Sequence, residues 1–131
     1  DDVMKVAGHR LSTAEVENAL TQHRAVAECA VVAAPHDIKG EVPVAFVTLK
    51  EGFNPSPALE NELMQQVVKV IGPTAKPEKI FLTDTLPKTR SGKIMRRIIK
   101  SLVKNEPVGD TTTLMNPEAF EELKKKVGSR G

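Results

Sequence analysis

Alternating and clustered hydrophobic residues predict four short strands along the chain. Two of them, rich in Val and Ala and separated by a turn around Asp37 and Gly40, are expected to pair as a hairpin. Pro43 must lie near the start of its strand or at a sheet edge, because proline cannot donate to the ladder. The first strand is expected to end at Gly8. The predicted strands cover residues 3–7, 25–34, 42–50 and 77–84.

Apolar residues at helical spacing predict helices between these strands. Ser12 and Glu15 have the spacing of a capping box. Ser56 followed by Pro57 predicts a second helix start, and Gly72 is expected to end that helix. The helices are expected over residues 13–23, 56–71, 94–104 and 117–127. The buried face of the second is expected to comprise Leu59, Leu63, Val67, Val70 and Ile71.

The order of these elements predicts an α+β fold. We expect a small mixed or antiparallel sheet of about three strands plus an N-terminal hairpin-like strand, packed with about three helices. Residues 1–105 form the predicted domain. Residues 106–131 form a tail extension whose short helix is expected to dock outside the domain or to fray.

Composition narrows the class of protein. A chain of 131 residues suits one domain plus a tail. The chain has no apolar run of the roughly 20 residues that a membrane span needs, and its single cysteine allows no internal disulfide. We therefore expect an intracellular, cytoplasmic protein that does not bind membranes. Because the chain starts with Asp1 rather than Met, we also expect it to be a piece of a longer protein.

Charge is distributed unevenly. Residues 1–87 have a net charge of −4, residues 88–104 carry seven Lys or Arg and no acid, and residues 105–131 have a net charge of −1. The basic segment is expected to face something anionic. Nucleic acid is disfavoured, because all four phenylalanines lie outside this segment and give it no stacking platform.

Two phrases could carry chemistry. In residues 87–94, Gly92 permits a tight turn, and Lys93 is expected at the start of a helix. The phrase does not match a Walker loop. Pro87 stands where that motif needs its first glycine, and Ile94 stands where it needs the Ser or Thr that binds magnesium. In residues 5–12, His9 and Arg10 are expected to project from a loop before a helix. An ordinary solvated loop is the alternative for each phrase taken alone.

Other kinds of catalytic site have little support. The three histidines are scattered without cysteines or acids at metal-ligand spacing. Ser12 and Ser91 have no visible general base, so a hydrolase triad is not indicated.

Taken together, the phrases DDVMKVAGHRL at residues 1–11 and LPKTRSGKIMRR at residues 86–97 resemble the carboxy-terminal domain of the adenylate-forming enzymes. The phrases PHDIKG, IGP and GDTTTL, which begin at Pro35, Ile71 and Gly109, resemble the AMP-forming acetyl-CoA synthetases within that superfamily. Propionyl-CoA synthetases and other short-chain relatives are the alternative. The similarity extends over essentially the whole chain.

The resemblance implies a two-step ligase whose substrates are acetate, ATP and CoA, with Mg²⁺ as the metal. Acetate and ATP give acetyl-adenylate and pyrophosphate, and CoA then displaces AMP. In this family the small carboxy-terminal domain rotates between the steps. The partner it implies is a larger amino-terminal domain, absent from this chain, that carries the acyl pocket and most of the ATP site.

Residue roles follow from the same resemblance. Lys93 matches the lysine that neutralises charge during adenylation, and Asp1 matches the hinge residue. Ala7 and Gly8 match the corner that lines the pantetheine tunnel, with any contact at Ala7 made through its backbone. Arg10 matches a residue that contacts the nucleotide phosphate after rotation. The family also implies acetylation of Lys93, and hence an acetyltransferase and a deacetylase as partners.

Two positions depart from the family or compete with a simpler structural role. Where close relatives have a CoA-binding arginine, this chain has Val68, so Lys69 either replaces that contact or CoA is held less tightly. Some relatives bind a divalent cation at positions that match Thr21, His23 and Val26. A helix C-terminal cap by His23 is the preferred interpretation there.

Two further hypotheses stay open beside the ligase. The first is a non-catalytic module that binds RNA or an acidic partner through residues 88–104, with a steep dependence on salt. The second treats the domain as a regulatory substrate modified at Lys93, which complements the ligase hypothesis.

Overall fold

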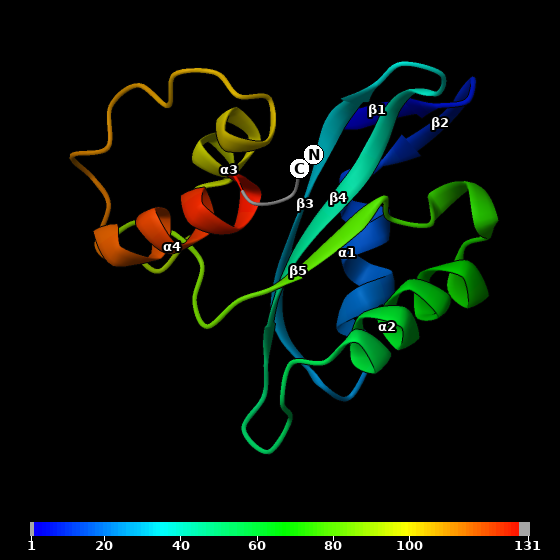
Figure 1. Ribbon diagram of the computed structural model, residues 1–131, viewed down its shortest axis with the longest axis horizontal. Coiled ribbons are helices and arrows are strands. Elements are labelled where there is room, and N and C mark those ends of the chain that lie inside the picture. Colours follow the sequence, from blue (N-terminus) through cyan, green and yellow to red (C-terminus); the bar gives the residue numbers. More distant parts are fainter. Residues whose placement is uncertain (1, 129–131) are drawn as a thin grey trace.

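A five-stranded sheet separates two pairs of helices in the computed structural model, which describes residues 2–128 (Figure 1). Helices α1 and α2 cover one face of the sheet, and α3 and α4 cover the other. The elements in chain order are β1 (Val3–Val6), β2 (His9–Ser12), α1 (Thr13–Thr21), β3 (Val26–His36), β4 (Gly40–Leu49), α2 (Pro57–Val70), a 3₁₀ turn η1 (Pro73–Ala75), β5 (Lys79–Leu82), α3 (Arg96–Val103) and α4 (Pro117–Gly128). The α+β prediction is confirmed.

The sheet is mixed, with β4 at its centre. The long β3–β4 hairpin is antiparallel and β5 runs parallel to β4, while β1 meets β4 only at the pair Val6 and Gly40. The edge of β4 that faces away from β3 is therefore shared by β1 and β5. Pro43 lies between these two contacts, and its carbonyl accepts from Glu78 N at 2.8 Å. Its lack of an N–H group therefore costs the sheet no hydrogen bond.

The N-terminal strand belongs to a two-stranded hairpin. Residues 9–12 form β2, which pairs with β1 from Val3–Ser12 to Val6–His9. The expectation that His9 and Arg10 lie in a loop is therefore wrong. Strong turn residues such as Asn-Gly are missing at the bend, where Ala7 and Gly8 both have positive φ, of 50° and 86°.

Alternation along the strands creates two hydrophobic cores, one on each face of the sheet. From Cys29 to Ala34 of β3, odd-numbered residues such as Val31 face α1 and α2, and even-numbered residues such as Val32 face α3 and α4. Both faces are therefore buried, which explains why the sequence of β3 is almost continuously apolar. Phe46 and Phe81 stack in the second core with their ring centroids 4.9 Å apart.

Local signals place the first two helices correctly. Ser12 and Glu15 form both hydrogen bonds of the capping box of α1, and Ser56 caps α2 with Pro57 at its first position. The buried face of α2 is shorter than expected, because Val70 and Ile71 are exposed. No helix within residues 2–128 is long and apolar enough to cross a membrane.

The tail helix packs on the domain itself. Ala119 and Leu123 of α4 are fully buried, and Leu123 joins the core of α3 and the sheet. The Thr83 hydroxyl donates to Glu122 Oε1 at 2.9 Å, which ties α4 to the chain after β5. The expectation that this helix docks outside the domain or frays is therefore wrong for its described residues.

Candidate functional site

A tight turn presents Lys93 to solvent. Gly92 has a φ of 86° and its N–H donates to the Thr89 carbonyl, while Thr89 N donates to the Lys93 carbonyl, both at 2.9 Å. An antiparallel bridge between Lys88 and Ile94 closes the base of the turn. The turn expected at Gly92 is confirmed. The helix begins only at Arg96, so the expectation that Lys93 stands at its start is wrong.

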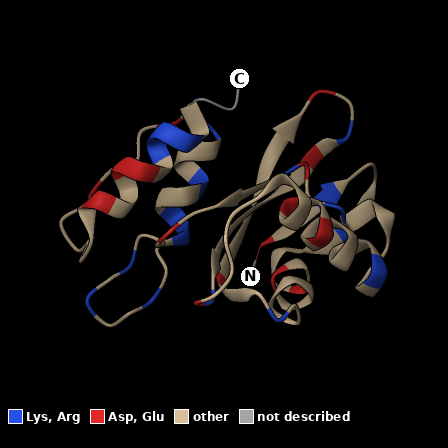
Figure 2. Cartoon of the chain, turned by 60° about the horizontal axis from the view of Figure 1, so that its bottom comes forward, with Lys and Arg blue, Asp and Glu red and all other residues tan. Residues whose placement is uncertain are grey.

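Most cations of the basic segment are engaged inside the domain. Within residues 2–128, only Arg90, Lys93 and Lys104 of the seven lack an ion pair or a side-chain hydrogen bond. The other four are Lys88, which pairs with Glu28, Arg96 with Glu17, Lys100 with Asp2, and Arg97, which donates to the carbonyls of Val108 and Asp110. Figure 2 shows the turn standing away from the sheet with basic residues as its only charges. The free positive charge is thus concentrated at its tip.

The second candidate is the bend of the β1–β2 hairpin. The Ala7 N–H donates to the Lys39 carbonyl at 2.9 Å, which fixes the bend against the β3–β4 turn. Ala7 and Gly8 are exposed, and a Cβ atom built on Gly8 meets no atom within 4 Å. Arg10 is exposed on β2 opposite Lys5. The bend can therefore meet another molecule through bare backbone.

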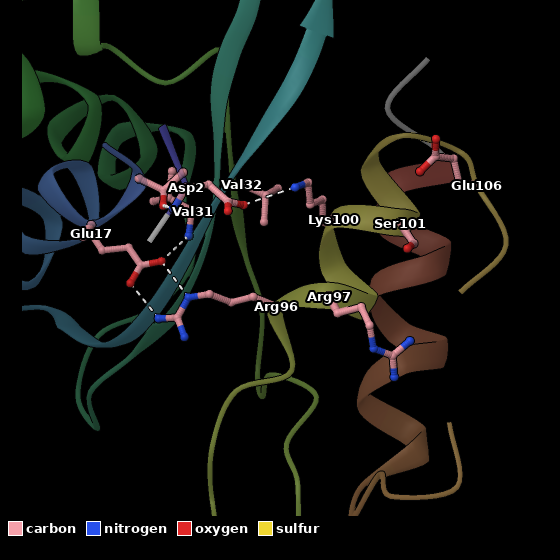
Figure 3. Close-up of a pocket in the computed structure, with 11 residues that line it drawn as sticks. Asp2, Glu17, Val31, Val32, Arg96, Arg97, Lys100, Ser101 and Glu106 are labelled. Atoms are coloured by element: carbon pink, nitrogen blue, oxygen red, sulfur yellow. Dashed lines mark hydrogen bonds and ion pairs between the residues drawn. The ribbon is translucent and has the colours of Figure 1, made fainter. Parts of the chain in front are cut away.

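A groove of about 550 Å³ lies between the start of α1, the outer edge of β3 and α3. Figure 3 shows Arg96 reaching from α3 to Glu17 on α1. Its Nε and Nη2 atoms donate to the two carboxylate oxygens at 2.9 and 2.6 Å, and the Val31 N–H also donates to Glu17 at 2.8 Å. This hydrogen bonding raises the pKa of Arg96. The Arg96–Glu17 ion pair thus holds the walls of the groove together.

Comparison with known proteins identifies the family of the chain. The model of the AMP-binding enzyme C-terminal domain matches residues 15–93, which is more than half of the chain. The chain belongs to this family. The match ends at Lys93, so the matched region includes the turn up to that lysine.

Curated relatives match almost the entire chain. Acetyl-coenzyme A synthetases of Pyrobaculum aerophilum and Bdellovibrio bacteriovorus are 56% and 57% identical over 125 residues, which cover 95% and 94% of this chain and 19% of each relative. A Brucella canis acyl-CoA synthetase structure superposes with a TM-score of 0.73 at 42% identity, over 77% of this chain and 19% of that one. An anthranilate CoA ligase solved with anthranoyl-AMP gives 0.72 at 38% identity, over 80% and 20%. The chain therefore spans about a fifth of the proteins it resembles.

Other positions carried over from the resemblance lie in the last turn of α2 and at the start of the chain. Lys69 is exposed in the last turn of α2 and has no ion pair within residues 2–128, while Val68 is half-buried beside it. Asp1 lies outside the described residues. The exposed Lys69 side chain is therefore free to meet a ligand. The roles of Lys69, Val68 and Asp1 stay predictions.

The proposed cation position does not suit a histidine ligand. His23 Nδ1 accepts from the Ala25 N–H at 3.0 Å, and its Nε2 contacts the Glu62 carboxylate. The His23 carbonyl accepts from the Val26 N–H. Both ring nitrogens are thus engaged, and neither bonds a carbonyl of α1, whose C-cap residue is Gln22 rather than His23. Within residues 2–128 no cluster of three His, Cys, Asp or Glu could hold a metal. A cation held at Thr21, His23 and Val26 mainly by main-chain carbonyls stays a prediction.

Sequence reasoning missed the residues that hold the Lys93 turn from the tail. Met115 N donates to the Lys88 carbonyl at 2.9 Å, and Thr89 and Leu114 form an antiparallel bridge. Asn116 is buried beside them. No local signal could reveal these contacts, because they join segments about 25 to 30 residues apart.

Proposed function

We propose that the chain is the carboxy-terminal domain of an AMP-forming acetate–CoA ligase, which converts acetate, ATP and CoA to acetyl-CoA, AMP and diphosphate. The observation that carries the proposal is the exposed, unpaired Lys93 ammonium on the last residue of a braced turn. Acetyl-CoA synthetases more than 50% identical over nearly the whole chain support acetate as the substrate.

In the adenylation step, the acetate oxygen attacks the α-phosphorus of ATP and pyrophosphate leaves. Lys93 is the group that this domain contributes. Its ammonium is mobile at the end of a flexible side chain, while its backbone is fixed by the N–H and the hydroxyl of Thr89. It can therefore follow the negative charge that develops on the phosphate and carboxylate oxygens. Most of the contacts to ATP and Mg²⁺ belong to the larger amino-terminal domain.

In the thioester step, the CoA thiol attacks the acetyl carbonyl and AMP leaves. After a rotation about Asp1, the bend at Ala7 and Gly8 lines the pantetheine path and Arg10 faces the nucleotide phosphate. The bare backbone of the bend supports this role, since a slender chain can pass close to it. Lys69 contacts the CoA nucleotide in place of the arginine that relatives have at Val68.

The same exposure of Lys93 supports regulation by acetylation. Transfer of an acetyl group to Nζ removes the positive charge that adenylation requires. A protein acetyltransferase and a deacetylase are then partners of this domain. Acetylation is expected to stop adenylation and to spare the thioester step.

The decisive experiment uses the full-length enzyme with Lys93→Ala. Acetate-dependent ATP–pyrophosphate exchange should fall by about 10²–10³, because one positioned charge at a developing oxyanion is lost. Thioester formation from supplied acetyl-adenylate should stay nearly unchanged. Arg90→Ala removes a second unpaired cation from the same turn and should preserve both activities. Equal loss of both half-reactions in Lys93→Ala would contradict the proposal.

A further inference from the structure

Asn116 connects the tail to the Lys93 turn through a buried amide. Its side chain lies directly before α4 and the residue is 8% exposed. Its Oδ1 accepts from the Lys88 N–H at 2.9 Å, and its Nδ2 donates to the Leu86 carbonyl at 2.8 Å and to Thr85 Oγ1 at 3.3 Å. One side chain thus holds the main chain on both sides of the buried Pro87.

These bonds fix the base from which the turn projects. Lys88 donates its N–H to Asn116 and accepts from the Met115 N–H through its carbonyl. The Pro87 carbonyl accepts from the Met95 N–H at 2.8 Å. The tail therefore adds a third segment beside the two arms of the turn. The turn residues from Arg90 to Lys93 extend beyond this frame, since Thr89 still bridges to Leu114.

Loss of the Asn116 amide would leave buried main-chain groups without partners. The Lys88 N–H and the Leu86 carbonyl would each need water or a shifted backbone, because a buried polar group left without a hydrogen-bond partner destabilises the fold. The easiest relaxation is a movement of residues 86–88. Such a movement would displace the turn and the lysine at its tip.

We propose that Asn116 is a positioning residue for Lys93 in the adenylation step, acting through the backbone of Leu86 and Lys88. The inference rests on the proposed function of Lys93. A shift of about 1 Å at a reacting centre can cost on the order of 10²-fold in rate. The tail thus belongs to the machinery of one half-reaction, although residues 94–131 lie outside the family match.

The test uses the full-length enzyme with Asn116→Ala. The kcat of acetate-dependent ATP–pyrophosphate exchange should fall by about 10- to 100-fold, with little change in KM for ATP. Thioester formation from supplied acetyl-adenylate should be unchanged. Asn116→Asp keeps the acceptor for Lys88 and loses the donor for Leu86, so its exchange rate should lie between those of Asn116→Ala and the parent. It also serves if Asn116→Ala does not fold.

Thr83→Val is the matched control. It removes a buried hydroxyl that ties α4 to the domain through Glu122 but does not touch Lys88 or Leu86. A merely structural tail would make Thr83→Val and Asn116→Ala alike, each lowering both half-reactions in proportion to lost folded enzyme. That result would overturn the inference. The expected result is a selective loss of exchange in Asn116→Ala only.

A double-mutant cycle distinguishes the proposed role of Asn116 from the proposed role of Lys93. In the Lys93→Ala background, Asn116→Ala should cause no further loss of exchange, because the group it positions is gone. Additive losses would refute positioning through Lys93. If Lys93→Ala alone leaves exchange intact, the proposed function fails. If Lys93→Ala abolishes exchange and Asn116→Ala does not lower it, only the role of Asn116 fails.

Discussion

At the scale of single residues, Glu17 links more of the fold than any sequence pattern indicates. Its carboxylate receives hydrogen bonds from Arg96 of α3 and from the main chain of β3. The Cys29 thiol lies close by and donates weakly to the Glu17 carbonyl. Burial, and then the charge of Glu17, raise the pKa of Cys29 to about 12. The thiol is therefore an inert core group at neutral pH.

This raised pKa predicts a loss of stability in alkali. The unfolded thiol releases its proton above about pH 8.5, whereas the folded thiol keeps it until about pH 12. The stabilisation is thus complete below the unfolded pKa and is lost as pH rises, with a slope of about 1.4 kcal/mol per pH unit. Urea unfolding between about pH 8 and pH 10.5 should show a steeper decline for the parent than for Cys29→Ala. Parallel curves would show that Cys29 does not contribute.

At the scale of elements, the signals that worked were local. The capping box of α1 and the Ser56–Pro57 start of α2 involve residues three or fewer positions apart, so the sequence alone suffices to find them. The turn at Gly92 is of the same kind. The strand β2 was missed because the bend that precedes it places Ala7 at positive φ, a conformation that alanine rarely adopts.

The β1–β2 bend gives a prediction about the thioester step. In the full-length enzyme, Gly8→Leu should leave acetate-dependent pyrophosphate exchange largely unchanged, while thioester formation should collapse because the side chain narrows the proposed CoA path. The Leu side chain has room within the domain, but its positive φ should cost about 1–2 kcal/mol of unfolding free energy. Thermal unfolding must therefore be compared first.

Gly52→Leu is the matched control for this substitution. Gly52 also has a positive φ, of 94°, and open space around its Cβ position, but it lies in the loop before α2. The two variants should lose similar stability and differ only in thioester formation. Loss of pyrophosphate exchange in a folded Gly8→Leu enzyme would place Gly8 outside the proposed face.

At the scale of the whole molecule, the tail and the domain share one core. Phe46 and Phe81 of the sheet, Ile99 of α3 and Leu123 of α4 belong to the same cluster. The sequence could predict the amphipathic α4 but not its docking, because the surface that receives it comes from segments that are far away in the chain. The prediction that Lys93 stands at the start of α3 was wrong because residues 93–95 form the closing arm of the turn, through the Lys88–Ile94 bridge and the hydrogen bond from Met95 N to the Pro87 carbonyl.

A single substitution tests whether the tail helix unfolds with the rest. Leu123→Ala should lower the free energy of unfolding by about 2–5 kcal/mol and preserve one cooperative transition, because it opens a cavity in the shared core. Met115→Ala, at a side chain that is 54% exposed, should have little effect. The measurement is urea unfolding followed by circular dichroism. An unchanged midpoint for Leu123→Ala would show that α4 is energetically separate.

The brace at Glu17 has a consequence for the behaviour of the molecule in crowded solution. β3 is an edge strand of eleven residues, and a long apolar edge is a template on which a second chain can add a strand. At Val31 the Glu17 carboxylate already occupies the N–H group that such an intruder would need, and Arg96 holds the carboxylate there. The contact that joins two helices to the sheet thus also protects the domain against edge-to-edge aggregation.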